Sequence, residues 1–310
     1  MTPDIWPVDP PRTPPLRLRG RTFDAARPAV MAIINRTPDS FYATAGTREV
    51  NAALAALDAA VAEGADLVDV GGVRAGQVGE WVDAAAEVSR ILPFLEAARE
   101  RHPDLVLSVD TWRSEVLDAV AHVGVDLVND TWAGHDPELA AGAAAVGAGY
   151  VVSHTGGLPP RTDPVDVTYG VDPEGVVVAV LTGLAEGAAR ALAAGVRPDG
   201  VLVDPTLDFG KTTRHSLRVL RHTAQVASLG FPVLQAISRK DFVGETLDLP
   251  ADERLEGSLA ATAVAAWLGA TVFRTHDVRA TRRVVDMVAS VRGDRPPTRA
   301  ERGEPAVGDV

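Results

Sequence analysis

Hydrophobic residues alternate between two patterns along most of the chain. Short runs rich in Val, Leu and Ile, typical of buried strands, are each followed by a longer Ala-rich segment with the period of a helix. The runs predict eight strands, at 29–35, 66–72, 105–111, 126–131, 149–155, 200–205, 232–238 and 271–277. Their cores are almost continuously apolar, as expected for parallel strands that are covered on both faces.

A segment of helical period follows every predicted strand. In the first segment Leu54, Leu57 and Val61 repeat at i, i+3 and i+7, which places them on one face. The eight segments are 48–64, 80–101, 113–124, 136–147, 174–195, 213–229, 253–268 and 278–292. Eight consecutive β–α units predict an α/β fold, a (β/α)8 TIM barrel in a single domain. The alternative, an open doubly wound sheet, would be unusually wide.

The two ends of the chain differ from this pattern. Residues 1–15 are rich in proline and residues 294–310 are polar and rich in Pro and Gly, so we expect loose tails around a barrel domain at 16–293. Residues 16–24 alternate around Gly20 and predict a short hairpin at the lower end of the barrel.

The composition is that of an ordinary globular domain, with 46% hydrophobic and 23% charged residues. A formal net charge of −12 argues against nucleic acid or a membrane surface as a partner. The absence of cysteine excludes disulfides, thiolate metal sites and a cysteine nucleophile. The N-terminus lacks the apolar stretch of a signal peptide, and the uncharged run between Glu256 and Arg274 is too short to span a membrane. We therefore expect a cytoplasmic protein.

A polar side chain stands near the C-terminal end of every predicted strand, where TIM barrels build their active sites. In chain order these residues are Asn35, Asp69, Asp110, Asn129, His154, Asp204, Ser238 with Lys240, and Arg274 with His276. Each alone has a structural explanation. Asp110 or Asp204 could cap the next helix, Asp69 could hold a turn, His154 could be a loop histidine with satisfied hydrogen bonds, and the cations could pair with the carboxylates. Together they favour a ligand site.

The residue types suggest a heterocycle that bears phosphate. Asp110, Asp204 and Asn129 offer acceptors to the N–H edge of a flat ring, and Lys240 could donate to a ring carbonyl. Arg274, with a histidine nearby, suits a phosphate or pyrophosphate group. The sequence contains no P-loop or dinucleotide-binding glycine fingerprint.

Several motifs share their order along the chain with one known family. They are Asn35-Arg36-Thr37-Pro38-Asp39-Ser40-Phe41, Glu63-Gly64-Ala65-Asp66, Asp69-Val70-Gly71-Gly72, Ser108-Val109-Asp110-Thr111, Asn129-Asp130, Asp204-Pro205, Asp208-Phe209-Gly210-Lys211, Ser238-Arg239-Lys240 and Arg274-Thr275-His276-Asp277. With these motifs the chain resembles the dihydropteroate synthases from about residue 30 to about residue 290.

The resemblance implies a transferase of folate biosynthesis, usually a homodimer, with a TIM-barrel fold. Such an enzyme joins 6-hydroxymethyl-7,8-dihydropterin pyrophosphate to 4-aminobenzoate and releases pyrophosphate. The resemblance also implies roles for the matching residues. The pterin would be bound by Asp110, Asn129, Asp204 and Lys240, and the pyrophosphate by Asn35, Arg274 and His276, with Asn35 also binding Mg²⁺. Catalysis would involve Lys240, Arg274 and His276, and the aminobenzoate would lie near Phe209 and Ser238. Cations and Mg²⁺ would stabilise the leaving pyrophosphate, and no protein nucleophile is needed.

Two loops depart from the family pattern. After Gly71-Gly72 the family continues as Glu-Ser-Thr-Arg-Pro-Gly, whereas this chain reads Val73-Arg74-Ala75-Gly76-Gln77. The threonine is missing, and Arg74 is not at the expected offset. In the first loop Ala43 replaces an expected aspartate. Thr206, Leu207 and Asp208 also replace small residues near the expected aminobenzoate site.

Three functions stay open on this basis. The first is a dihydropteroate synthase, and the alternative is a divergent second-copy paralogue that binds a pterin with little or no synthase activity. The third is another pterin-using barrel, such as a corrinoid-linked methyltransferase, against which the Arg274-Thr275-His276 and Ser238-Arg239-Lys240 motifs count. The pterin pocket matches the family better than the second-substrate site does.

Overall fold

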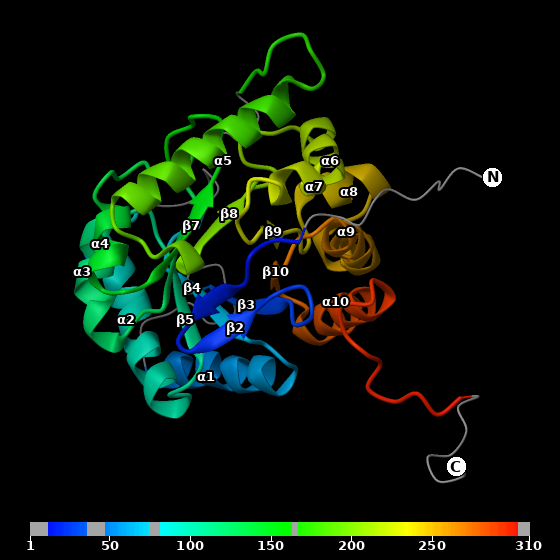
Figure 1. Ribbon diagram of the computed structural model, residues 1–310. Helices are drawn as coiled ribbons and strands as arrows, with labels where there is room; N and C mark the ends of the chain where they lie inside the picture. Colours follow the sequence, from blue (N-terminus) through cyan, green and yellow to red (C-terminus); the bar gives the residue numbers. More distant parts are fainter. Residues whose placement is uncertain (1–11, 36–46, 75–80, 163–166, 303–310) are drawn as a thin grey trace, which may run out of the picture.

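A computed structural model describes residues 12–35, 47–74, 81–162 and 167–302. In these residues an eight-stranded sheet lies inside a ring of helices (Figure 1). Its strands are β3 (Ala29–Asn35), β4 (Leu67–Gly71), β5 (Val106–Asp110), β6 (Leu127–Asp130), β7 (Gly149–Ser153), β8 (Val201–Asp204), β9 (Leu234–Ala236) and β10 (Val272–Thr275). All neighbours pair in parallel, in the order β8-β7-β6-β5-β4-β3-β10-β9. A parallel bridge from Val203 to Val233 brings the two end strands together, so the predicted TIM barrel is confirmed.

The helices follow the strands as the sequence predicts, with two differences. They are α1 (Thr47–Ala62), α2 (Ala84–Arg101), α3 (Ser114–Val120), α4 (Leu139–Ala145), α5 (Gly175–Ala193), α6 (Thr213–Arg221), α7 (Thr223–Ala227), α8 (Asp241–Leu247), α9 (Leu255–Trp267) and α10 (Val278–Val291). The single helix predicted over 213–229 is divided at His222 into α6 and α7. The sequence did not predict α8, because seven residues are too few to reveal a helical period.

The lower end of the barrel is filled by apolar side chains. The predicted hairpin is present as β1 (Leu16–Leu18) and β2 (Arg21–Phe23), which pair antiparallel. Leu16, Leu18 and Phe23 are buried with inward-facing strand residues such as Met31 and Leu202. Because this packed plug occupies the interior, a ligand site can open only at the other end of the barrel.

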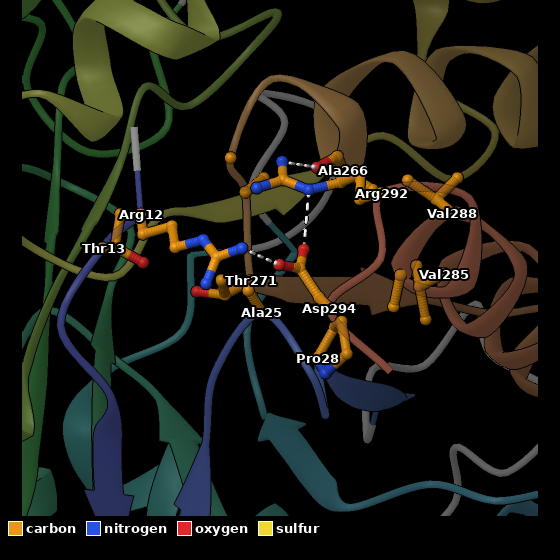
Figure 2. A pocket seen from close by; sticks show the side chains of 13 residues that line it. Arg12, Thr13, Ala25, Pro28, Ala266, Thr271, Val285, Val288, Arg292 and Asp294 are labelled. Atoms are coloured by element: carbon orange, nitrogen blue, oxygen red, sulfur yellow. Dashed lines mark hydrogen bonds and ion pairs between the residues drawn. The ribbon is translucent and has the colours of Figure 1, made fainter. Parts of the chain in front are cut away.

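Residues inside the two predicted tails, Arg12 and Asp294, meet at this lower end, so the tails are not loose where they join the barrel. Arg12 lies 2.9 Å from Asp294 in an ion pair, and Arg292 donates to the other oxygen of the same carboxylate over 2.8 Å (Figure 2). The cavity beside them has a volume of about 10 Å³, which is room for one water molecule. It is therefore not a candidate for an organic ligand.

One described helix, α5, has the length and apolar composition of a membrane span. Val180, Leu184 and Ala188 on one face are buried, and the helix packs against β7 and β8. Its place in the barrel wall explains its apolar character.

Candidate functional site

A cavity of about 580 Å³ opens at the C-terminal ends of the strands. Its lining includes most of the residues expected in the site: Asn35, Asp110, Asn129, Asp204, Phe209, Lys240, Arg274 and His276. Ser238 does not line it, but its Oγ lies 3.3 Å from Nδ1 of His276 and accepts a hydrogen bond from the His276 backbone N–H at 3.2 Å. The volume is in the range of small-molecule sites.

Arg274 is held between two carboxylates. Its Nε lies 2.6 Å from Asp69 Oδ2, and one terminal nitrogen lies 2.9 Å from Asp110 Oδ2. Asp69 is fully buried outside the cavity lining, and it also accepts hydrogen bonds from Ser108 Oγ at 2.5 Å and Asn129 Nδ2 at 2.9 Å. Asp69 therefore orients an amide and a guanidinium that do reach the cavity.

Asp110 is a carboxyl group in the cavity lining with a raised pKa. Burial raises its pKa to about 7, although the charge of Arg274 opposes this shift. The Thr131 hydroxyl donates to Oδ1 over 2.7 Å, while Arg274 occupies Oδ2. Any ligand donor must share this carboxylate with groups already bonded to it.

Asp204 and Lys240 are two more charged residues of the cavity lining. Asp204 is buried, and its Oδ1 accepts the Thr206 backbone N–H at 2.7 Å. Burial raises the pKa of Asp204, and the charge of Lys240 partly offsets this. Lys240 donates to the Leu207 carbonyl, and its Nζ lies 4.9 Å from the centroid of the Phe209 ring. Burial lowers the pKa of Lys240. A desolvated carboxylate and a desolvated ammonium group thus line one side of the cavity.

A buried lysine holds the loop that carries Phe209. Lys211 Nζ donates to the carbonyls of His154 at 2.7 Å, Thr206 at 3.1 Å and Phe209 at 2.9 Å. Thr206 has a φ of 52° and Asp208 a φ of 70°, a conformation that non-glycine residues rarely adopt. The three bonds stabilise this turn and tie the loop after β7 to the loop after β8.

His154 does not reach the cavity. A Cβ on Gly183 of α5 would lie 2.8 Å from His154 Cδ2, so the imidazole ring packs outward against this helix. Burial lowers the pKa of His154 to about 3, which keeps the ring neutral. His154 is therefore a packing residue outside the cavity, although its buried Nδ1 lacks the hydrogen bond that the structural explanation expects.

The cavity also contains residues that the sequence analysis did not single out. Thr131, Trp112 and Trp132 line it, and Trp132 meets Phe209 edge to face with 5.5 Å between ring centroids. Trp112 and Trp132 each stand two residues after a strand, a placement that could have identified them. The aromatic rings give the cavity flat apolar walls beside its charged groups.

The divergent loops are described only in part. Val73 and Arg74 line the cavity. Ala43 and residues 75–77, as well as residues 36–41 of the first motif, lie outside the described residues. Among the described residues, no group of three or more His, Asp or Glu side chains could hold a metal ion.

Comparison with known proteins agrees with the motifs. Residues 31–276 match the family model described as "Pterin binding enzyme". The chain is 54% identical over 286 residues to "Inactive dihydropteroate synthase 2" of Mycobacterium leprae, an alignment that covers 92% of this chain and 98% of that protein.

Solved structures of two synthases superpose on most of the chain. The dihydropteroate synthase of Coxiella burnetii, in complex with pteroic acid, is 31% identical, with a TM-score of 0.79 and coverage of 90% of this chain and 99% of that one. The dihydropteroate synthase of Xanthomonas albilineans, with 4-aminobenzoic acid, is 34% identical, with a TM-score of 0.78 and coverage of 90% and 98%. By motifs, fold and overall similarity, this chain belongs to the dihydropteroate synthase family of pterin-binding enzymes.

Proposed function

We propose that this chain is a divergent paralogue that binds a pterin pyrophosphate in its cavity and has little or no dihydropteroate synthase activity. One observation carries the proposal: the cavity has the family's pterin residues on one side and Val73 and Arg74 where the family has Glu and Ser. The 54% identical relative from M. leprae is named inactive, whereas the two solved synthases are 31% and 34% identical. Similarity therefore favours the paralogue over the synthase.

The geometry supports pterin binding. Asp204 and Asn129 present oxygen acceptors to the N–H edge of an aminopyrimidinone ring, and Lys240 offers a donor for its carbonyl. Trp112, Trp132 and Phe209 offer the flat faces that a heterocycle needs. Arg274 and His276 stand at the end of β10, where the pyrophosphate would lie.

The altered loop after β4, rather than the groups shared with the synthases, disfavours turnover. Loss of pyrophosphate leaves a delocalised cation on the pterin methylene, so the rate depends on cations that stabilise the leaving charge. Arg274 already bonds Asp69 and Asp110, which offset its charge. Burial lowers the pKa of His276 to about 4, and a pyrophosphate beside the ring would raise it again. Because Arg274 and His276 stand in a family motif, the missing loop residues must account for a loss of turnover.

Magnesium fits this site as a companion of the substrate. Asn35 is the expected metal-side residue and lines the cavity, but the described residues contain no cluster of carboxylates and histidines to hold an ion. Mg²⁺ commonly keeps several waters and binds through substrate phosphates with one or two protein oxygens. Asn35 would supply such an oxygen, and the ion would neutralise charge on the leaving pyrophosphate.

A homodimer is part of the proposal. After Glu256, α9 carries no charged residue, although one side of this helix faces away from the barrel. Val264 on α9 and Met287 and Val291 on α10 are exposed, and the two helices pack side by side (Figure 1). Exposed apolar faces of this kind are typical of subunit contacts, and sedimentation velocity measures the oligomeric state directly.

The test combines pyrophosphate release with calorimetry on one purified sample, supplied with Mg²⁺, 6-hydroxymethyl-7,8-dihydropterin pyrophosphate and 4-aminobenzoate. We expect the pterin ester to bind and no pyrophosphate to be released. Release that requires 4-aminobenzoate would instead establish a synthase. Absence of pterin binding would exclude both functions. The X. albilineans enzyme serves as the active control.

A further inference from the structure

A second cavity lies outside the barrel wall, between α4, α5 and β7. Its volume is about 130 Å³, and among the described residues it shares no lining residue with the cavity of about 580 Å³ at the strand ends, here called the main cavity. Tyr150 and Val152 line it from the outer side of β7, because Val151 between them is buried in the barrel interior. The two helices pack against β7 and against each other (Figure 1). The second cavity is therefore separate from the site described above.

Most of this lining is apolar. Pro137 and Ala140 on the α4 side, Val152 on β7 and Ala191 on α5 contribute small carbon side chains. A Cβ on Gly187 of α5 would collide with Val152 Cγ1, so the helix approaches the strand as closely as glycine allows. An apolar cavity of about 150 Å³ holds a benzene ring. The second cavity thus has room for an apolar group of about that size.

Arg190 on α5 is the only cation that lines the second cavity among the described residues. Its side chain is exposed at the surface, and its guanidinium folds back along the helix, since a Cβ on Gly187 would lie 3.6 Å from Nη2. Within the described part of the chain this guanidinium has no hydrogen-bond or ion-pair partner. A guanidinium can bind one carboxylate through two parallel N–H bonds. Arg190 therefore offers a free anion-binding group beside an apolar space.

The two carboxylates in this lining already bind donors of the protein. Asp130 accepts the Tyr150 hydroxyl and the Gly134 backbone N–H, both at 2.6 Å. Asp136 accepts two backbone N–H groups, at 2.7 Å and 3.0 Å. Because these bonds hold the aspartates to the protein, the group left for a ligand is the cation of Arg190, which favours an anionic ligand.

We propose that the second cavity is a binding site for a small organic acid, whose apolar body fills the space and whose carboxylate pairs with Arg190. This site goes beyond the proposed function, because it uses no pterin and no residue of the main cavity.

The probe is benzoate, and calorimetry measures its dissociation constant. Arg190→Met should weaken benzoate binding by about tenfold or more, because the carboxylate loses its charged donors while a long apolar side chain remains. Benzamide keeps the ring without the charge, so its dissociation constant should be the same in both proteins. Ala140→Leu should weaken binding of both compounds by about tenfold, since the larger side chain occupies the space of the ring.

Arg221→Met on α6 is the matched control. This exposed arginine lines neither cavity, so its loss removes the same charge and should leave benzoate binding unchanged. Arg190→Met replaces an exposed side chain and keeps the test valid if Ala140→Leu does not fold.

Two outcomes would overturn the inference. Benzoate could enter the main cavity instead, in which case Lys240→Met would weaken its binding and Arg190→Met would not. The unaltered protein could also bind no benzoate. In either case the proposed function would stand, because it is tested separately with the pterin ester.

Discussion

The carboxylate of Asp204 is the strongest single anchor that the cavity offers. It is buried and bonds one backbone N–H at 2.7 Å, which leaves acceptor capacity for a ligand. Asp110, by contrast, has a donor on each oxygen. Carboxylates that look equivalent in the sequence therefore differ in what they can offer a ligand.

Asp204→Ala should weaken pterin binding by about 1–3 kcal/mol, because ligand donors would be left unpaired in a closed pocket. Calorimetry with the dihydropterin measures the loss. Asp58→Ala is the control, since this residue pairs with Arg101 on the outer surface at 2.6 Å and should leave binding unaltered. Equal affinity in both variants would remove Asp204 from the site.

At the scale of elements, the loops after β7 and β8 depend on each other through Lys211. Its buried ammonium group donates to three carbonyls in these loops, and among the described residues only the Thr206 carbonyl also accepts a backbone N–H, that of Phe209 at 3.2 Å. Burial lowers the pKa of Lys211 to about 7 from the ordinary value of 10.5. Between these two pH values the unfolded chain binds the proton and the folded chain does not, so this group makes the free energy of unfolding rise with pH.

Lys211→Met should lower the free energy of unfolding by about 2–4 kcal/mol, because three buried carbonyls lose a charged donor. In the unaltered protein the free energy of unfolding rises with pH because of Lys211, and the variant lacks this rise. The difference in free energy of unfolding between the two proteins should therefore be larger at about pH 9 than at about pH 6. Urea unfolding at both pH values gives the two differences. The same deficit at both would show that Lys211 does not titrate in this window.

At the scale of the whole molecule, the first described segment meets the segment after α10 at the lower end of the barrel, through Arg12 and Asp294. Asp294 has a side-chain exposure of 3% and bonds Arg292, whose exposure is 7%, whereas the Arg12 side chain is 67% exposed. The pair of Arg292 and Asp294 is thus buried, whereas the contact of Arg12 with Asp294 is exposed to solvent.

Asp294→Asn should lower the free energy of unfolding by about 3 kcal/mol or more, because the buried Arg292 loses its counter-charge. Arg12→Met is the matched comparison and should cost less than about 1 kcal/mol, as exposed ion pairs contribute little. Chemical unfolding of the two variants measures both losses in the free energy of unfolding. A larger loss for Arg12→Met than for Asp294→Asn would contradict this account.

The sequence by itself determined the barrel, the hairpin plug and the end of the barrel where polar groups gather. Periodicity is a local property, and eight repeats of one β–α unit leave little choice of topology. Only the tertiary structure decided which of those groups reach the ligand. His154 and Trp112 both lie at strand ends, yet one packs outward against α5 and the other lines the cavity. Asp69 and Arg274 form an ion pair across 205 positions of sequence. Side-chain direction reverses with each residue at the end of a strand, and burial depends on distant segments. Neither can be derived from local pattern.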